Sequence, residues 1–162
     1  MDRKEAERQL SRCDSYQLLH RLFAIKSQLW PPTWLKLLGE KWTLCDNIWR
    51  YTDRILFEKP IANINGPVRQ MMTNEEWEEL GKMPDQIPIF RGCYENLNED
   101  GISYSLDERT AKCHVTLNGY RVAGKQPILQ YGLVDKSTII AYKHDRNERE
   151  IIIRECEIIH VE

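Results

Sequence analysis

The sequence predicts an α+β fold in which helices come first and a mainly antiparallel sheet follows. In residues 1–72, apolar side chains recur every three or four positions, which is the spacing of one helix face. In residues 73–162, short runs rich in isoleucine, valine and tyrosine lie between turn residues, which is typical of strands. We therefore predict a helical region over 1–72 and a strand-rich region over 73–162, packed as one compact unit.

Two long helices are expected in the helical region. The first is predicted over residues 3–29 and ends before Pro31, because proline lacks the N–H donor and restricts the residue before it. The second is predicted over residues 33–57, and residues 59–67 are predicted to form a loop. Each helix carries an apolar stripe that is expected to face the protein interior.

Three tryptophans lie in the second helix: Trp34, Trp42 and Trp49. Interleaved with Arg50 and Arg54, they could stack on nucleic-acid bases. Tryptophans at helical spacing are far more often core residues, and Asp46 and Asp53 offset the two arginines. We therefore interpret the stripe as packing against the sheet, and we expect no nucleic-acid partner.

Charge and cysteine content narrow the class of protein further. The chain has 23 Lys+Arg and 25 Asp+Glu residues and a formal net charge of −2, which argues against a general nucleic-acid coat or a polybasic membrane binder. No apolar run reaches the roughly 20 residues of a membrane span. The five cysteines and four histidines are scattered and form no metal-ligand motif. We expect reduced thiols, no metal and a cytoplasmic location.

A short helix is predicted at the start of the strand-rich region. It begins at Thr73, which forms a capping box with Glu76. Trp77 and Leu80 are expected on its buried side, and Gly81 favours its end.

Six strands are predicted after this helix. Their ranges are 87–93, 102–106, 128–134, 138–142, 148–153 and 157–161. Between the second and third strands, Asp107 is expected to cap a helix that reaches about His114. Asn118 and Gly119 predict a turn, and whether this turn closes a hairpin stays open.

Two of the strands carry polar residues that suit ligand binding. Arg91 ends a hydrophobic run and offers a planar fork of donors for phosphate oxygens, and Gly92 after it permits close approach to the backbone. Ser103 and Ser105 share one strand face, where two hydroxyls can orient a carboxylate and a ribose. Taken alone, each motif fits a structural role better: an exposed strand arginine before a turn, and the polar face of a half-buried strand.

A third strand carries two acidic residues on one face, Glu148 and Glu150. Paired carboxylates suit two tasks on one ligand, one steadying a developing cation and the other accepting a proton. The structural alternative is a solvated entry to the apolar strand that follows.

Arginine, Ser-x-Ser and Glu-x-Glu, in this order and each on its own strand, resemble the Arg-Ser-Glu class of mono-ADP-ribosyltransferases. The resemblance covers about residues 73–154, and flanking sequence supports it: the run from Leu80 to Asp85 before the arginine motif and the run from Gly101 to Asp107 before a helix. The run from Ile139 to Glu150 also looks like the last part of small phage and prophage proteins of this type. The implied fold is a split, mainly antiparallel sheet.

The resemblance implies that NAD is a substrate and assigns roles to individual residues. Arg91 would bind the pyrophosphate side of NAD, and the Gly92 backbone would hydrogen-bond the nicotinamide amide. Ser103 would help to place the catalytic Glu150, which would hold the nicotinamide ribose and stabilise the oxocarbenium-like ion. Glu148 would position or deprotonate the acceptor, and glutamate at this position looks like the arginine-modifying subset. Tyr104 would pack near the nicotinamide or serve as a core aromatic.

The sequence departs from the family in one place. Only 11 residues, 92–102, separate Arg91 from Ser103, where many members have a helix that covers the adenosine end of NAD. The adenine site is therefore unassigned, and the N-terminal helices are a candidate substitute cover.

Three functions follow from the resemblance. The first is a mono-ADP-ribosyltransferase, phage- or prophage-derived, that modifies a side chain of a host or defence protein. The second is an inactive protein of the same fold that docks onto a partner. The third is an NAD glycohydrolase, in which water is the acceptor.

Overall fold

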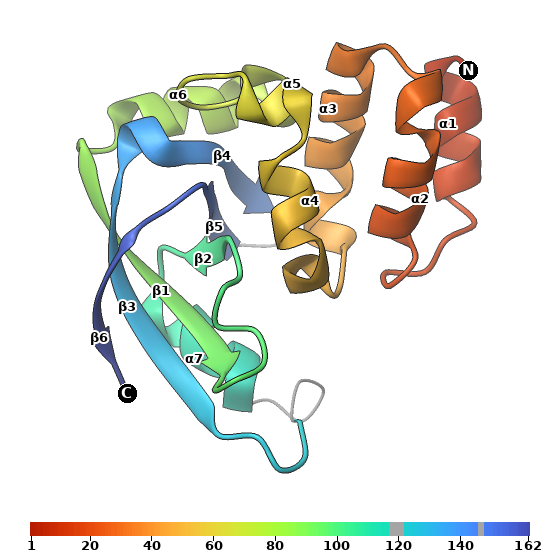
Figure 1. Cartoon of the computed structure of the whole chain (residues 1–162). Helices are drawn as coiled ribbons and strands as arrows, with labels where there is room; N and C mark the ends of the chain where they lie inside the picture. Colours follow the sequence, from red (N-terminus) through yellow and green to blue (C-terminus); the bar gives the residue numbers. More distant parts are fainter. Residues whose placement is uncertain (117–121, 146–147) are drawn as a thin grey trace.

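The computed structural model of the protein describes residues 1–116, 122–145 and 148–162. Helices combine with an antiparallel sheet, which confirms the predicted α+β class (Figure 1). The elements of the helical region are α1 (Arg3–Leu10), α2 (Leu18–Ile25), η1 (Lys26–Gln28), α3 (Pro31–Lys41), η2 (Trp42–Leu44), η3 (Ile48–Tyr51), α4 (Thr52–Leu56), α5 (Lys59–Ala62) and η4 (Arg69–Met71).

The prediction of one long first helix is wrong, because the chain turns between Leu10 and Leu18. The Asp14 carboxylate accepts the backbone N–H of Tyr16 at 3.0 Å and that of Gln17 at 2.9 Å. Aspartate bonded in this way to nearby amides favours a turn over a continuous helix.

The second long helix is also interrupted, and α3 ends at Lys41. Asn47 has a left-handed backbone with φ of 60°, which a right-handed helix cannot contain. The amide of the preceding Asp46 donates to the carbonyl of Ser15 at 2.9 Å, so a contact with another segment holds the break. The predicted loop that follows contains the one-turn helix α5.

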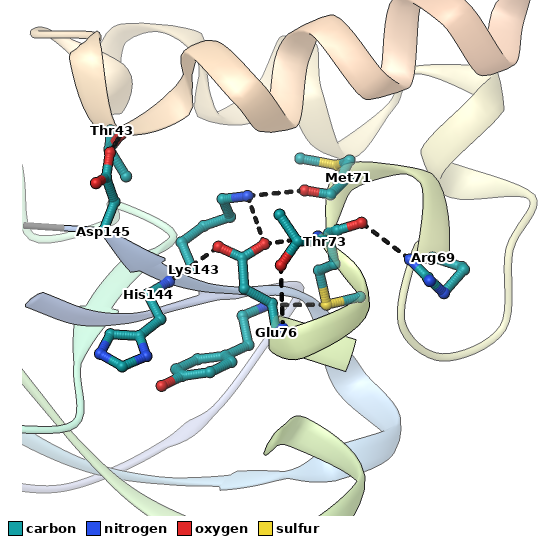
Figure 2. Close-up of polar contacts among 10 residues, drawn as sticks. Thr43, Arg69, Met71, Thr73, Glu76, Lys143, His144 and Asp145 are labelled. Atoms are coloured by element: carbon teal, nitrogen blue, oxygen red, sulfur yellow. Dashed lines mark hydrogen bonds and ion pairs between the residues drawn. The ribbon is translucent and has the colours of Figure 1, made fainter. Parts of the chain in front are cut away.

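The short helix α6 (Asn74–Lys82) begins at the predicted capping box of Thr73 and Glu76. Leu80 is buried as predicted, but Trp77 is not. Trp77 is 40% exposed and lies under the guanidinium of Arg69, whereas Glu76 is only 6% exposed. The acidic residue is buried because it pairs with Lys143 of the sheet at 2.8 Å (Figure 2). The indole of Trp77 is left on the outer side of the helix.

All six predicted strands are present, and the last two have the predicted bounds. The strands are β1 (Gln86–Tyr94), β2 (Ser103–Ser105), β3 (Pro127–Asp135), β4 (Ile139–Asp145), β5 (Glu148–Ile153) and β6 (Glu157–Val161). Helix α7 (Glu108–Thr116) follows β2, and the carboxylate of Asp107 accepts the amide of Thr110 at 2.8 Å, as a cap does. The predicted turn at Asn118 and Gly119 lies outside the described residues.

The strands form one antiparallel sheet in the order β4-β5-β2-β1-β3-β6. Its two halves, β4-β5-β2 and β1-β3-β6, meet through a single residue pair, Phe90 with Ser105. Among the described residues, β1 and β2 form no further register pair, and α7 packs against β1. The pairing is thus interrupted between two strands that each carry a sequence-predicted site residue.

One hydrophobic cluster joins the helical region to the sheet. Trp34 and Trp42 have no exposed surface, which confirms that these two tryptophans are core residues. Trp34 contacts Leu22 and Phe23 of α2, whereas Trp42 contacts β5 of the sheet. The amide of Val68 donates to the carbonyl of Ile140 at 2.7 Å, and so extends the contact to the main chain of β4. In the described ranges, no helix has the length and apolar content that a membrane crossing requires.

Candidate functional site

A cavity of about 1000 Å³ lies between the helical region and the sheet. On one side it is lined by residues of the segments 13–18 and 42–50, and on the other by strands β1, β2 and β5 and helix α7. This volume is at the upper end of the range for ligand pockets. The helical region therefore forms a wall of the cavity that contains the predicted site residues.

The serine and glutamate motifs meet on one face of the sheet. Ser105 is the register partner of Glu150, and residues two positions apart along a strand share a face, which adds Ser103 and Glu148. The hydroxyl of Ser103 donates to Oε1 of Glu150. The structure thus brings together two motifs that lie more than 40 residues apart in the sequence.

Glu150 is a carboxylate of the cavity wall whose pKa departs from its ordinary value. Burial raises its pKa above the ordinary value, against the lowering effect of hydrogen bonds from Ser103 and Trp42. The indole N–H of Trp42 donates to Oε1 at 2.7 Å. Among the residues that the structure describes, no lysine or arginine forms an ion pair with Glu150. A carboxylate that is oriented but has no close cation interacts strongly with positive charge on a ligand.

Glu148 lies one pleat further out than Glu150 and is exposed at the cavity. It is the register partner of Asp145, since β4 extends three residues beyond its predicted end. The hydroxyl of Ser105 accepts the amide of Asp107 at 2.9 Å. Ser105 thus takes part in the turn into α7, which is the structural role that the sequence also suggested.

Arg91 is placed differently from the other motif residues. Strand alternation from the pair Phe90 with Ser105 directs the Cα–Cβ bond of Arg91 to the face opposite that of Ser105. Its guanidinium extends into the gap between β1 and β2, where it donates to the carbonyls of Ser103 at 2.6 Å and Asn98 at 3.0 Å. The contacts hold β2 and the preceding loop where the strands share only one pair, and phosphate binding by Arg91 stays a prediction.

Two glycines permit close packing here, Gly101 against the guanidinium of Arg91 and Gly92 against helix α7. A Cβ on Gly101 would lie 2.0 Å from Nη2 of Arg91. A Cβ on Gly92 would lie 2.1 Å from the carbonyl oxygen of Ala111 in α7. The close approach that Gly92 permits is thus that of a helix, and backbone binding of a nicotinamide amide stays a prediction.

Tyr104 fits the core alternative. It is 5% exposed, its hydroxyl hydrogen-bonds Gln130 at 3.3 Å, and its ring lies 5.8 Å from the guanidinium carbon of Arg91. The ring helps to enclose the buried cation from the side away from Glu150.

Sequence reasoning missed two residues of the cavity. Trp42 was interpreted only as a core residue. The sequence does not indicate which acceptor the indole N–H of a buried tryptophan will contact. His114 was expected near the end of a helix, and it lines the cavity from α7, where a positive charge on it would lower the pKa of Glu150. Neither residue belongs to a recognisable motif.

Within the described ranges, no three histidine, cysteine, aspartate or glutamate side chains gather in an arrangement that could hold a metal ion. No protein-family model, curated protein or solved structure matches this chain. The interpretation of the cavity therefore depends on its geometry and on the resemblance of the three motifs.

Proposed function

We propose that the protein is a mono-ADP-ribosyltransferase that uses NAD to modify a protein side chain, with arginine as the favoured acceptor. The observation that carries the proposal is the environment of Glu150. Its carboxylate has two hydrogen-bond donors, Trp42 and Ser103, and lies on the wall of a cavity of about 1000 Å³. The resemblance to phage and prophage proteins favours a host or defence protein as the target.

The chemistry explains why this environment suits the reaction. The C–N bond between the ribose and nicotinamide breaks, its electron pair goes to the nicotinamide nitrogen, and positive charge develops on the ribose. A carboxylate fixed beside the ribose stabilises the transition state most, because the positive charge on the ribose is greatest there. Glu150 is suited to this role because it already lacks a cation partner among the described lysines and arginines.

The acceptor would then enter from the side of Glu148. A guanidinium nitrogen of the target forms a bond with C1′ of the ribose and releases a proton, which Glu148 accepts. Glu148 is exposed, whereas Glu150 is partly buried, so a bulky protein acceptor reaches the outer carboxylate first. In a glycohydrolase, water would take the place of the guanidinium.

A second candidate, an inactive protein of the same fold, is favoured by one observation. Both terminal nitrogens of Arg91 already donate to main-chain carbonyls, and among the described residues only its Nε is left without an acceptor. In this case the cavity wall would serve as a docking surface, and NAD would not be consumed.

The test is incubation of the protein with NAD labelled on the adenylate phosphate. Agmatine, a small guanidino compound, and a host-cell lysate serve as acceptors. We expect nicotinamide release, and label on agmatine or on a protein band. Glu150→Gln should abolish both signals, whereas Glu157→Gln, on the far edge strand β6, should retain them. Equal release by wild type and Glu150→Gln would contradict the proposal, and release without labelled acceptor would indicate the glycohydrolase.

A further inference from the structure

We infer that Trp42, which lies outside the region of family resemblance, is a positioning residue for Glu150: its indole N–H orients the carboxylate and favours the charged form. The relevance to catalysis rests on the proposed function, but the coupling of the two residues does not. The helical region would then be a part of the site as well as its cover.

The contact is specific in its atoms. Nε1 of Trp42 donates to Oε1 of Glu150 at 2.7 Å, and the Ser103 hydroxyl donates to the same oxygen. Within the described ranges, neither donor contacts Oε2. Two donors from different elements thus fix one carboxylate oxygen and leave the other for a ligand. Because the indole can only donate, the contact favours the charged carboxylate over the protonated form.

Neighbouring contacts fix the position of the indole. Trp42 has no exposed surface and begins η2, directly after α3. The hydroxyl of the next residue, Thr43, donates to the carboxylate of Asp145 at 2.8 Å (Figure 2). This contact ties η2 to the end of β4, the strand that pairs with β5. The indole is therefore held against β5 from two sides, by the core and by a polar contact.

Other charged groups also act on Glu150, and any titration reflects all of them. Positive charge on His114 and on Arg91 favours the carboxylate, and negative charge on Glu148 opposes it. Cys45, on the same segment as Trp42, has a thiol whose burial raises its pKa to about 12, so it is neutral at ordinary pH. Lys143 is the register partner of Glu150, but its ammonium group pairs with Glu76.

The chain contains a matched control for Trp42. Trp34 also has no exposed surface, and its Nε1 donates at 2.8 Å to the backbone carbonyl of Leu22. The two indoles thus differ mainly in the acceptor, which is a titratable carboxylate for Trp42 and a carbonyl for Trp34. A phenylalanine in either position removes the N–H and retains most of the apolar volume.

The first measurement uses the wild-type chain without NAD. In proton–nitrogen NMR spectra, the Trp42 indole resonance should shift with pH, at the same midpoint as the labelled carboxyl carbon of Glu150. The shift should disappear in Glu150→Gln, and the Trp34 indole should show no shift at this midpoint. If the Trp42 indole resonance does not shift as Glu150 titrates, the inference is overturned. This result is obtained on the wild-type chain, so it does not depend on the folding of a variant.

The second measurement compares the two phenylalanine variants. Trp42→Phe should raise the titration midpoint of the Glu150 carboxyl by about one pH unit, since a hydrogen bond to a charged group is lost. Trp34→Phe should leave it in place. If nicotinamide release is observed, its acidic limb should move upward in Trp42→Phe alone. Equal midpoints in both variants would overturn the inference, whereas the expected midpoints without NAD turnover would remove only the proposed function.

Discussion

Two regions of the molecule bury a glutamate near the paired strands β4 and β5, and they shift the pKa of this glutamate in opposite directions. At the contact of α6 with β4, burial acts to raise the pKa of Glu76, but hydrogen bonds from Lys143 and from two backbone amides outweigh it, and the pKa lies below the ordinary value (Figure 2). At the cavity, burial outweighs two hydrogen bonds, and the pKa of Glu150 lies above the ordinary value.

The difference lies in how completely each charge is satisfied. The ammonium group of Lys143 donates to Glu76 at 2.8 Å and to the carbonyl of Met71 at 3.0 Å, and the other oxygen of Glu76 accepts the amide of His144 at 3.0 Å. Among the residues that the structure describes, donors reach only one oxygen of Glu150, Oε1. A satisfied buried pair holds two elements together, whereas a carboxylate with an open oxygen is available to a ligand.

The largest expected effect is on the satisfied pair. Lys143→Met should lower the free energy of unfolding by about 3–5 kcal/mol, because it leaves the Glu76 carboxylate buried without its cation. Unfolding in urea measures the loss. Adding Glu76→Leu to the variant should recover part of it, since the uncompensated charge is removed. A loss below about 1 kcal/mol would mean that the pair does not hold α6 on β4.

The next effect concerns the gap between the two halves of the sheet. Arg91→Ala should lower the free energy of unfolding by about 1–3 kcal/mol, because two carbonyls lose a charged donor. Arg91→Lys should recover only part of this, since an ammonium group cannot reproduce the planar fork. Calorimetric titration with NAD on both variants would show whether the arginine also binds the ligand. Wild-type stability of Arg91→Ala would remove the structural role that the two contacts indicate.

The third effect has the opposite sign. Glu150→Gln should not destabilise the protein at pH 7 and should stabilise it, because each unit by which burial raises the pKa costs about 1.4 kcal/mol when the group is ionised. As the pH falls through the raised pKa, Glu150 becomes protonated in the folded wild type, and the stability of wild type should approach that of the variant. Below the ordinary value of 4.5, the carboxyl is neutral in both the folded and the unfolded chain, so the stability difference due to its charge should be absent. Melting temperatures of both proteins across this range test the sign. A destabilised Glu150→Gln at neutral pH would mean that its charge is satisfied.

The contribution of Glu76 should depend on pH in the other direction. Its pKa is lower in the folded than in the unfolded chain, so its stabilisation is present above the ordinary value of 4.5 and is lost as the pH falls through the lowered pKa. The stability difference between wild type and Glu76→Gln should therefore shrink below pH 4.5. A difference that grows with acid would reverse the assignments of the two regions.

The smallest effect is expected for the outer carboxylate. Glu148→Gln should leave nicotinamide release near the wild-type rate and lower the transfer of label to agmatine or protein. The reason is that Glu148 is exposed and one pleat away from Glu150, so it meets the acceptor and not the developing cation. The same two assays, normalised to protein with unchanged circular dichroism, separate the steps. Equal losses of nicotinamide release and of label transfer would mean that the two glutamates act in the same step.

The sequence by itself determined much of the strand-rich region. Strand patterns with period two and the caps at Thr73 and Asp107 are local, so all six strands and both capped helices were predictable. Face sharing within each strand also placed Ser103 with Ser105 and Glu148 with Glu150, because side-chain alternation needs no tertiary information.

Only the tertiary structure decided what these residues contact. The helix breaks near Asp14 and Asn47 depend on local turns and on a contact between segments that the apolar stripe did not reveal. The burial of Glu76 in place of Trp77 required Lys143 from a strand 67 residues away. Likewise, Trp42 contacts Glu150, which is 108 residues away in the sequence. A contact at such a separation depends on how the elements pack, which periodicity within one element does not determine.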